Sequence, residues 1–279
     1  MSKKRKNTQK KAVNSKTAGS SEQTSATCDQ SSSLRKKRFE SFPLHLVPND
    51  NYAGKYDAAE LQELCKGRVW VIPSFFSSKE CKAWIDYCES FSSSNGFQYT
   101  AHPANKYITN RECYRLQQEN ATELSERIFD RLKGMKGGSL LGQIQKETSD
   151  IYPSRRSHGS KQSSAYKPIN CNPNIRVYRY DEGHAFGRHE DESNVLDSGR
   201  TTEMTMLVYL STCRGGATRF YRSGNRRSKQ ADSSFAFQPQ VGTLLLHVHG
   251  QHCLEHEAEV VLGGQKYVLR TDLVYGNAS

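Results

Sequence analysis

The second half of the chain is a succession of short predicted strands. After residue 172, β-branched and aromatic residues fall in brief runs bounded by Gly, Asp and Ser, with no helical periodicity between them. The runs cover residues 175–180, 205–211, 217–221, 234–238, 242–249 and 266–275. Short strands at this spacing are typical of antiparallel sandwiches and barrels. We therefore expect a jelly roll, or double-stranded β-helix, over about 172–276.

The segment before this core has a mixed pattern. Residues 57–65 and 121–132 have helical spacing, and the capping pattern Ser77 to Glu80 predicts a helix that follows a strand over 68–76. Residues 134–170 are rich in Gly, Ser, Lys and Arg, so we expect a mobile loop there. The fold class is thus mainly β (α+β), with N-terminal helices flanking the jelly roll in one domain over 42–279.

The N-terminal segment carries most of the positive charge. Residues 1–38 hold 11 Lys or Arg against two acidic residues, a net +9 out of +11 for the chain. Few large apolar residues occur here, so residues 1–41 are expected to be a disordered basic tail. The runs KKRK at 3–6 and RKKR at 35–38 are typical of nuclear import signals or nucleic-acid contacts, and a solubilising tail explains them equally well.

Cysteine usage and hydropathy indicate the compartment. The eight cysteines form no CxxC pair, and no apolar run approaches the roughly 18 residues that a membrane helix needs. We therefore expect a reducing compartment, nuclear or cytoplasmic, and no membrane partner. The sequence indicates no oligomeric state.

Two histidines and a carboxylate form the most informative residue pattern. His189 and Asp191 lie two residues apart, so both point to the same side of a strand. His256 follows an apolar strand and precedes the last strand, on which Lys266 and Arg270 share one face. Two His and one carboxylate on a rigid scaffold are the facial triad of non-haem iron. These three are the candidate metal ligands and catalytic residues.

A rival metal site surrounds His247. The run His247-Val248-His249, with His252 and Glu255 nearby, resembles the first motif of a cupin. A cupin would also need a following glycine at the right interval and a second motif bearing Pro and His, which the chain lacks. We expect His247 and His249 to be strand or loop histidines near the pocket.

These motifs together resemble the 2-oxoglutarate/Fe(II) oxygenase superfamily, in its prolyl 4-hydroxylase-like branch, from about Gly67 to Tyr275. The resemblance lies in their order. The chain shows Tyr180, Gly183, His189-Glu190-Asp191, Val208-Tyr209-Leu210, Gly215-Gly216-Ala217-Thr218-Arg219-Phe220, His256, Gly264 and Lys266. A departure is Phe186, which stands where relatives often have a tyrosine and which cannot donate a hydrogen bond.

The resemblance implies roles for individual residues. Fe(II) would be held by His189, Asp191 and His256. The distal carboxylate of 2-oxoglutarate would be held by Lys266, ten residues beyond His256, with Arg270 as the alternative because a guanidinium pairs well with a carboxylate. Two further residues complete the implied site: Tyr209 would donate its hydroxyl to the same carboxylate, and Tyr180 would line the iron side of the pocket. An ordinary core position explains these tyrosines equally well.

The resemblance also implies a reaction. A dioxygenase of this kind takes O2 and 2-oxoglutarate, releases succinate and CO2, hydroxylates a substrate, and uses ascorbate to rescue oxidised iron. The expected substrate is a protein side chain, prolyl by analogy. Two alternatives remain: oxidative demethylation of nucleic acid, with contacts through the basic tail, and a catalytically silent jelly-roll module that binds a nuclear partner. The intact residues His189, Asp191, His256 and Lys266 argue against the silent module.

Overall fold

The structure, a computed structural model, describes residues 38–49, 59–103, 109–152, 166–197, 199–222 and 233–277. All of them belong to the unit that runs from residue 36 to the C-terminus. The predicted tail over 1–41, with its basic runs, lies outside the described residues except for 38–41.

Strands dominate the described chain, as predicted. The helices are α1 (Ser78–Glu89), α2 (Thr122–Gly134) and α3 (Ser139–Glu147), with 3-10 turns at Leu44–Leu46, Met135–Gly138 and Gly250–His252. The strands are β1 (Gln62–Cys65), β2 (Val69–Ile72), β3 (Gln98–His102), β4 (Arg111–Gln118), β5 (Tyr166–Cys171), β6 (Ile175–Tyr180), β7 (Phe186–His189), β8 (Val195–Asp197), β9 (Arg200–Tyr209), β10 (Arg214–Gly215), β11 (Thr218–Arg222), β12 (Ser233–Phe237), β13 (Leu244–Val248), β14 (His256–Ala258), β15 (Val261–Gly263) and β16 (Lys266–Asn277).

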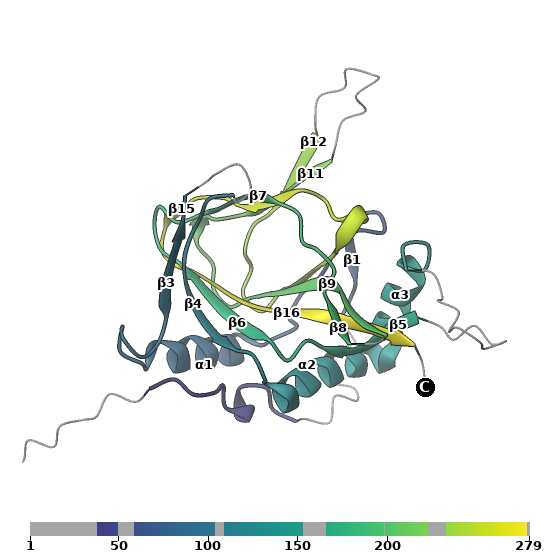
Figure 1. Cartoon of the computed structure of the whole chain (residues 1–279), viewed down its shortest axis with the longest axis horizontal. Coiled ribbons are helices and arrows are strands. Elements are labelled where there is room, and N and C mark those ends of the chain that lie inside the picture. The colour runs from purple at the N-terminus through teal and green to yellow at the C-terminus, as the bar shows by residue number, and fades with distance from the viewer. Residues whose placement is uncertain are drawn as a thin grey trace, which may run out of the picture. The chain divides into compact units, whose positions relative to one another are not determined.

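The strands form a jelly roll, which confirms the predicted fold class. One antiparallel sheet runs in the order β1-β2-β13-β9-β16-β6-β4-β7-β14-β11-β12, with β10 and β15 as a separate pair. Many neighbours in this order are far apart in sequence, as in β9–β16 and β7–β14. The sheet curls on itself, so β7, with which β14 pairs, faces β9 and β16 across the interior, while α1 and α2 lie along the outer side (Figure 1).

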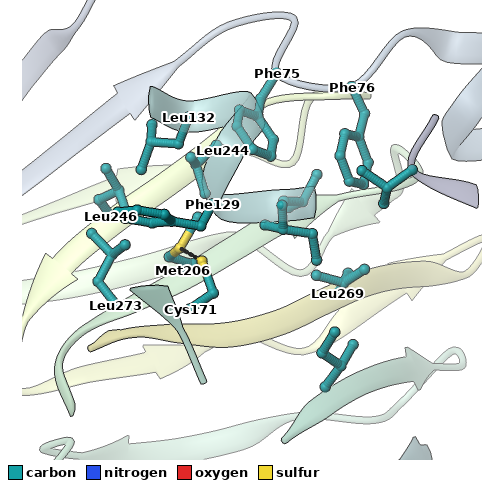
Figure 2. Close-up of a cluster of buried hydrophobic side chains, with 14 of the residues drawn as sticks. Phe75, Phe76, Phe129, Leu132, Cys171, Met206, Leu244, Leu246, Leu269 and Leu273 are labelled. Atoms are coloured by element: carbon teal, nitrogen blue, oxygen red, sulfur yellow. Dashed lines mark hydrogen bonds between the residues drawn. The ribbon is translucent and has the colours of Figure 1, made fainter. Parts of the chain in front are cut away.

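Alternation along the central strands separates two environments. Successive strand residues point to opposite faces, and one face of β9, β13 and β16 packs under α2 and the segment after β2. That face carries the large apolar core residues Phe75, Phe76, Phe129, Leu132, Met206, Leu244, Leu246, Leu269 and Leu273, which are buried together (Figure 2). The opposite face points into the roll and carries polar residues, among them Thr205, His247, Lys266 and Arg270.

The helices form where the sequence predicts them, in two of three cases. At α1 the Ser77 side chain accepts from the backbone N–H of Glu80 and the Glu80 side chain accepts from the N–H of Ser77, which confirms the capping box. In α2, Leu124, Ile128 and Leu132 are buried on one face. The helix expected over 57–65 is wrong in its described part, because β1 occupies Gln62–Cys65 as an edge strand on β2.

The loop expected over 134–170 also requires correction. Residues 139–147 form α3, which buries Leu140 and Ile144 at helical spacing, and residues 166–171 form β5, which pairs with β16. The apolar stripe of this helix is short, and the glycine pair directly before it, Gly137 and Gly138, indicates a loop. Both glycines adopt positive φ just before the helix. Residues 153–165 of the expected loop lie outside the described residues.

Strands β3 and β4 had no counterpart in the sequence analysis. They pair with each other, and the other edge of β4 pairs with β6 along most of its length and with β7 at Arg111, so β4 links the two parts of the curled sheet. Within the described residues, no helix is both long and apolar enough to cross a membrane.

Candidate metal centre

The two histidines of the predicted triad face each other through strand pairing. In the antiparallel β7–β14 pair, His256 is the direct partner of His189, and their ring centroids lie 4.3 Å apart. Asp191 follows β7 by two residues. Its Oδ1 lies 3.9 Å from Nε2 of His189 and its Oδ2 lies 3.8 Å from Nε2 of His256. One ligand atom from each residue falls within 4.8 Å of the other two, a spacing that one metal ion can bridge.

Backbone carbonyls fix the orientation of both imidazoles. His189 Nδ1 lies 2.8 Å from the carbonyl oxygen of Gly187, and His256 Nδ1 lies 2.9 Å from that of Leu254. A carbonyl only accepts, so each Nδ1 carries the proton and donates, which leaves the lone pair on Nε2. This hydrogen-bonded arrangement is the one that metal-binding histidines require.

Protonation also favours a cation at this place. Burial, followed by the charge of His256, lowers the pKa of His189 to about 3, and burial lowers the pKa of His256. Burial alone would raise the pKa of Asp191, but the Arg270 guanidinium and the nearby histidines hold it well below its ordinary value. At neutral pH the three residues therefore present two neutral imidazoles and one carboxylate, and the donor set fits Fe(II).

Asp191 is itself held from two sides. The Thr205 hydroxyl donates to Oδ2 over 2.6 Å, and the Arg270 guanidinium lies 3.0 Å from the same oxygen. Arg270 Nε is also 3.5 Å from an oxygen of Asp272. Arg270 is therefore already paired with two carboxylates. Its bond to Asp191 orients the carboxylate and fixes the guanidinium in the wall of the site.

Lys266 has no such partner, although it is more deeply buried than Arg270. It enters the roll from the start of β16, and its exposed fraction is 2%. Among the described residues, its Nζ donates only to the carbonyl oxygen of Gly216, at 2.7 Å. Burial lowers the pKa of Lys266 to about 8. A buried ammonium without a carboxylate is costly, so the arrangement favours an anionic ligand.

The backbone next to Lys266 depends on glycine. Gly216 has φ +65°, and a Cβ there would lie 2.8 Å from Cys213 Sγ and 3.4 Å from Cδ of Lys266. Only glycine adopts this conformation without strain and leaves room for the lysine stem. The Gly215-Gly216 pair, which the sequence shows as part of a motif, thus leaves space for the Lys266 side chain.

One cavity joins these groups. Its volume is about 50 Å³, and it is partly open to solvent. Its walls include the three triad residues, Lys266, Arg270 and Tyr180, together with an aromatic and aliphatic surface from Tyr178, Phe186, Leu207 and Val268. The candidate metal ligands and the Lys266 ammonium therefore share one cavity, as a ligand that chelates a metal at one end and carries an anionic group at the other would require.

The two predicted tyrosines differ in position. Tyr180 is the direct strand partner of Lys266 and lines the cavity. Tyr209 is fully buried, and its hydroxyl lies 2.7 Å from that of Thr218, which does line the cavity. Lys266 Nζ is 5.5 Å from the ring centroid of Tyr180 and 5.7 Å from that of Tyr209. Both rings thus flank the ammonium, and Thr218 lines the same cavity.

Sequence reasoning missed several polar residues of the cavity, among them Arg111 and Thr205. Arg111 comes from the unpredicted strand β4, and its guanidinium lies over the rings of Tyr178 and Phe186, 4.7 and 4.3 Å from their centroids. No local signal marks it, because only the pairing of β4 with β6 and β7 brings it there. Thr205 could have been found, since it shares the inward face of the predicted strand 205–211 with Tyr209.

A family model matches part of the chain. Residues 175–271 match the 2OG-Fe(II) oxygenase superfamily. The matched segment contains all three triad residues, Lys266 and Arg270. No match was found among curated proteins.

Solved structures of similar fold include three that span most of the chain. A collagen prolyl hydroxylase of Paramecium Bursaria Chlorella virus-1 is 19% identical, covers 77% of this chain and 99% of its own, and has a TM-score of 0.42. A prolyl-4-hydroxylase of Pseudomonas putida is 13% identical, with coverages of 74% and 91% and a TM-score of 0.45. The carbocyclase SnoK of nogalamycin biosynthesis is 12% identical, with coverages of 86% and 88% and a TM-score of 0.47.

Proposed function

We propose that this chain, which belongs to the 2OG-Fe(II) oxygenase superfamily and is a 2-oxoglutarate-dependent dioxygenase, hydroxylates a protein side chain. The observation that carries the proposal is the cavity in which the His189, Asp191 and His256 cluster and the unpaired ammonium of Lys266 both lie. A 2-oxo acid with a distal carboxylate matches both features, because one end chelates metal and the other end is an anion.

Six polar residues of the cavity have a task in this proposal, together with Thr218. His189, Asp191 and His256 would hold Fe(II), and Lys266 would pair with the distal carboxylate of 2-oxoglutarate, beside Thr218. Bound iron, 2-oxoglutarate and O2 supply the oxidising chemistry, in which one oxygen atom ends in succinate and the other in the hydroxylated product. Arg270 and Thr205 keep the Asp191 carboxylate in place and ionised, which preserves the negative charge that a cation needs.

The walls of the cavity suggest the kind of side chain that reacts. Phe186 stacks on His189 with ring centroids 3.8 Å apart, so an apolar surface lies beside the metal ligands. Tyr178, Leu207 and Val268 extend it. Such walls favour an apolar group, for example a pyrrolidine ring, and exclude water from the reacting centre. A prolyl side chain is therefore the substrate that we propose to test first.

Two further parts of the proposal come from the sequence and the resemblance, not from the structure. Ascorbate is proposed as the reductant that restores iron to its ferrous state. A nuclear or cytoplasmic site of action is proposed from the basic runs at 3–6 and 35–38.

The test begins without any substrate to be hydroxylated. Purified protein with Fe(II), ascorbate and 2-oxoglutarate is expected to form succinate slowly, and omission of iron is expected to stop it. Proline-containing peptides should then accelerate succinate formation and gain one oxygen atom by mass spectrometry. Methylated oligonucleotides serve as the matched alternative substrates. Acceleration by oligonucleotides alone would contradict the proposed substrate class, and absence of any iron-dependent turnover would contradict the enzyme assignment.

The affinity for 2-oxoglutarate is expected to depend on pH through Lys266. Burial lowers the pKa of Lys266 to about 8, so the ligand-free ammonium is charged below that pH and loses its proton above it. The apparent Kd should therefore be flat below about pH 8 and rise roughly tenfold for each pH unit above it. The rise should end where 2-oxoglutarate binds to the protein with neutral Lys266. Anaerobic titration with Mn(II) in place of iron measures this, and Lys266→Met should abolish the dependence.

A further inference from the structure

One histidine of the cupin-like motif, His247, belongs in the structure to a second cluster of side chains that could bind a metal. One ligand atom from each of His247, Cys253 and His256 lies within 4.8 Å of the other two, and all three residues are buried. This cluster and the triad share His256. They differ in kind, since the triad offers nitrogen and oxygen whereas this set offers nitrogen and sulfur.

His247 is the residue that the proposed reaction does not use. It enters the interior from β13, and its exposed fraction is 1%. Its Nε2 has no hydrogen-bond partner in the described part of the chain, although it lies 3.5 Å from Oδ2 of Asp191. Its Nδ1 has only distant neighbours, the Val248 carbonyl oxygen at 3.4 Å and Cys253 Sγ at 4.0 Å. A buried imidazole nitrogen without a partner costs free energy unless a ligand satisfies it.

Cys253 is placed next to the same centre by the backbone. Its Sγ accepts a hydrogen bond from the backbone N–H of Asp191, 3.3 Å away, and the 3-10 turn Gly250–His252 brings it back toward β13. Among the described residues, it is the only thiol that groups with histidines in this way. The thiol is therefore held between a residue of the triad and the unused His247.

We propose that His247, Cys253 and His256 form a second site for a soft divalent cation such as Zn²⁺, which excludes iron because both sites need His256. Thiolate and imidazole ligands prefer Zn²⁺, whereas two imidazoles and a carboxylate suit Fe(II). When Zn²⁺ binds, the Cys253 thiol releases its proton to solvent and the sulfur becomes a ligand. No electron is transferred. Zinc would thus switch the protein off by moving His256 from one ligand set to the other.

The direct test uses Cd²⁺ as a spectroscopic probe on the full chain. Cadmium bound to a thiolate absorbs in the ultraviolet through charge transfer, and cadmium bound to nitrogen and oxygen alone does not. Titration of the wild type is expected to give this band, saturating at one equivalent. Cys253→Ser should abolish the band, and His247→Asn should weaken binding by at least roughly 100-fold, since even outer partners of metal ligands contribute about 10–100-fold.

Two matched variants make the result specific. His189→Ala removes a triad residue that the second cluster does not need, so the cadmium band should persist. Cys65→Ser removes a partly exposed thiol on β1 and should also leave the band unchanged. Anaerobic Fe(II) should weaken cadmium binding competitively. The proposal fails if the wild type gives no band, if the band survives Cys253→Ser, or if Fe(II) does not compete. Near-ultraviolet circular dichroism checks that each variant is folded. If Cys253→Ser does not fold, His247→Asn keeps the test decisive.

The inhibitory consequence rests on the proposed function and is measured apart from it. Zn²⁺ should suppress iron-dependent succinate formation, and Cys253→Ser should need at least roughly tenfold more Zn²⁺ for the same suppression. A protein without turnover but with the cadmium band would retain the second site and lose only the enzyme assignment. Equal zinc sensitivity in both proteins would contradict the switch.

Discussion

Replacing Asp191 with alanine is expected to abolish iron binding and to lower iron-dependent succinate formation by at least roughly a thousandfold. Loss of residues that merely support a metal ligand costs about 10–100-fold, and Asp191 is the single anionic member of the triad. The change also leaves the Arg270 guanidinium, now 3.0 Å from Asp191 Oδ2, without that partner beside the metal site. An unpaired cation at this place repels Fe(II).

Iron per chain, measured with a colorimetric chelator after anaerobic desalting, reports the first effect, and succinate formation reports the second. Asp197→Ala is the matched control, because this carboxylate pairs with Arg200 at the exposed β8–β9 hairpin and lies outside the cavity. It should retain iron and turnover. Normal iron content in Asp191→Ala would overturn the assignment of the triad and direct attention to the cluster of His247, Cys253 and His256.

Replacing Lys266 with methionine is expected to raise KM for 2-oxoglutarate about 100-fold, while iron content stays unchanged. A buried hydrogen-bonded pair of charges contributes about 2–5 kcal/mol when one partner is removed, and the lower half of that range corresponds to this factor. Methionine keeps much of the apolar stem, so the change removes charge rather than volume. Lys79→Met, at an exposed lysine of α1, is the control and should leave KM unchanged.

The thermal stability of the ligand-free protein distinguishes the role of Lys266 from that of Arg270, the alternative anchor for 2-oxoglutarate. Lys266 is a buried cation whose Nζ has one carbonyl partner, so Lys266→Met should leave Tm unchanged or raise it. Arg270 pairs with Asp191 and Asp272, so Arg270→Met strands two carboxylates and should lower Tm. Thermal denaturation of both variants without ligand, beside their KM values, decides which residue anchors 2-oxoglutarate. A large KM effect at Arg270 together with none at Lys266 would reverse our assignment.

The sequence by itself determined the fold class and the residues to inspect. Alternation of apolar and polar residues specifies a strand and its two faces, because successive side chains point to opposite sides. For this reason the strands at 175–180 and 266–275 were predicted close to their true bounds, and Lys266 and Arg270 were placed on one face. The capping box at Ser77 is equally local, since it depends on residues three positions apart.

Only the tertiary structure decided what those residues meet. His189 opposes His256 because β7 and β14 pair in one register, and a register between segments more than 60 residues apart leaves no local signal. The same holds for Arg111, which arrives on a strand that the sequence analysis did not predict. Pairing also separated two cations that look alike in the sequence: Arg270 lies against Asp191 and Asp272, whereas Lys266 remains without a carboxylate and is free to bind one.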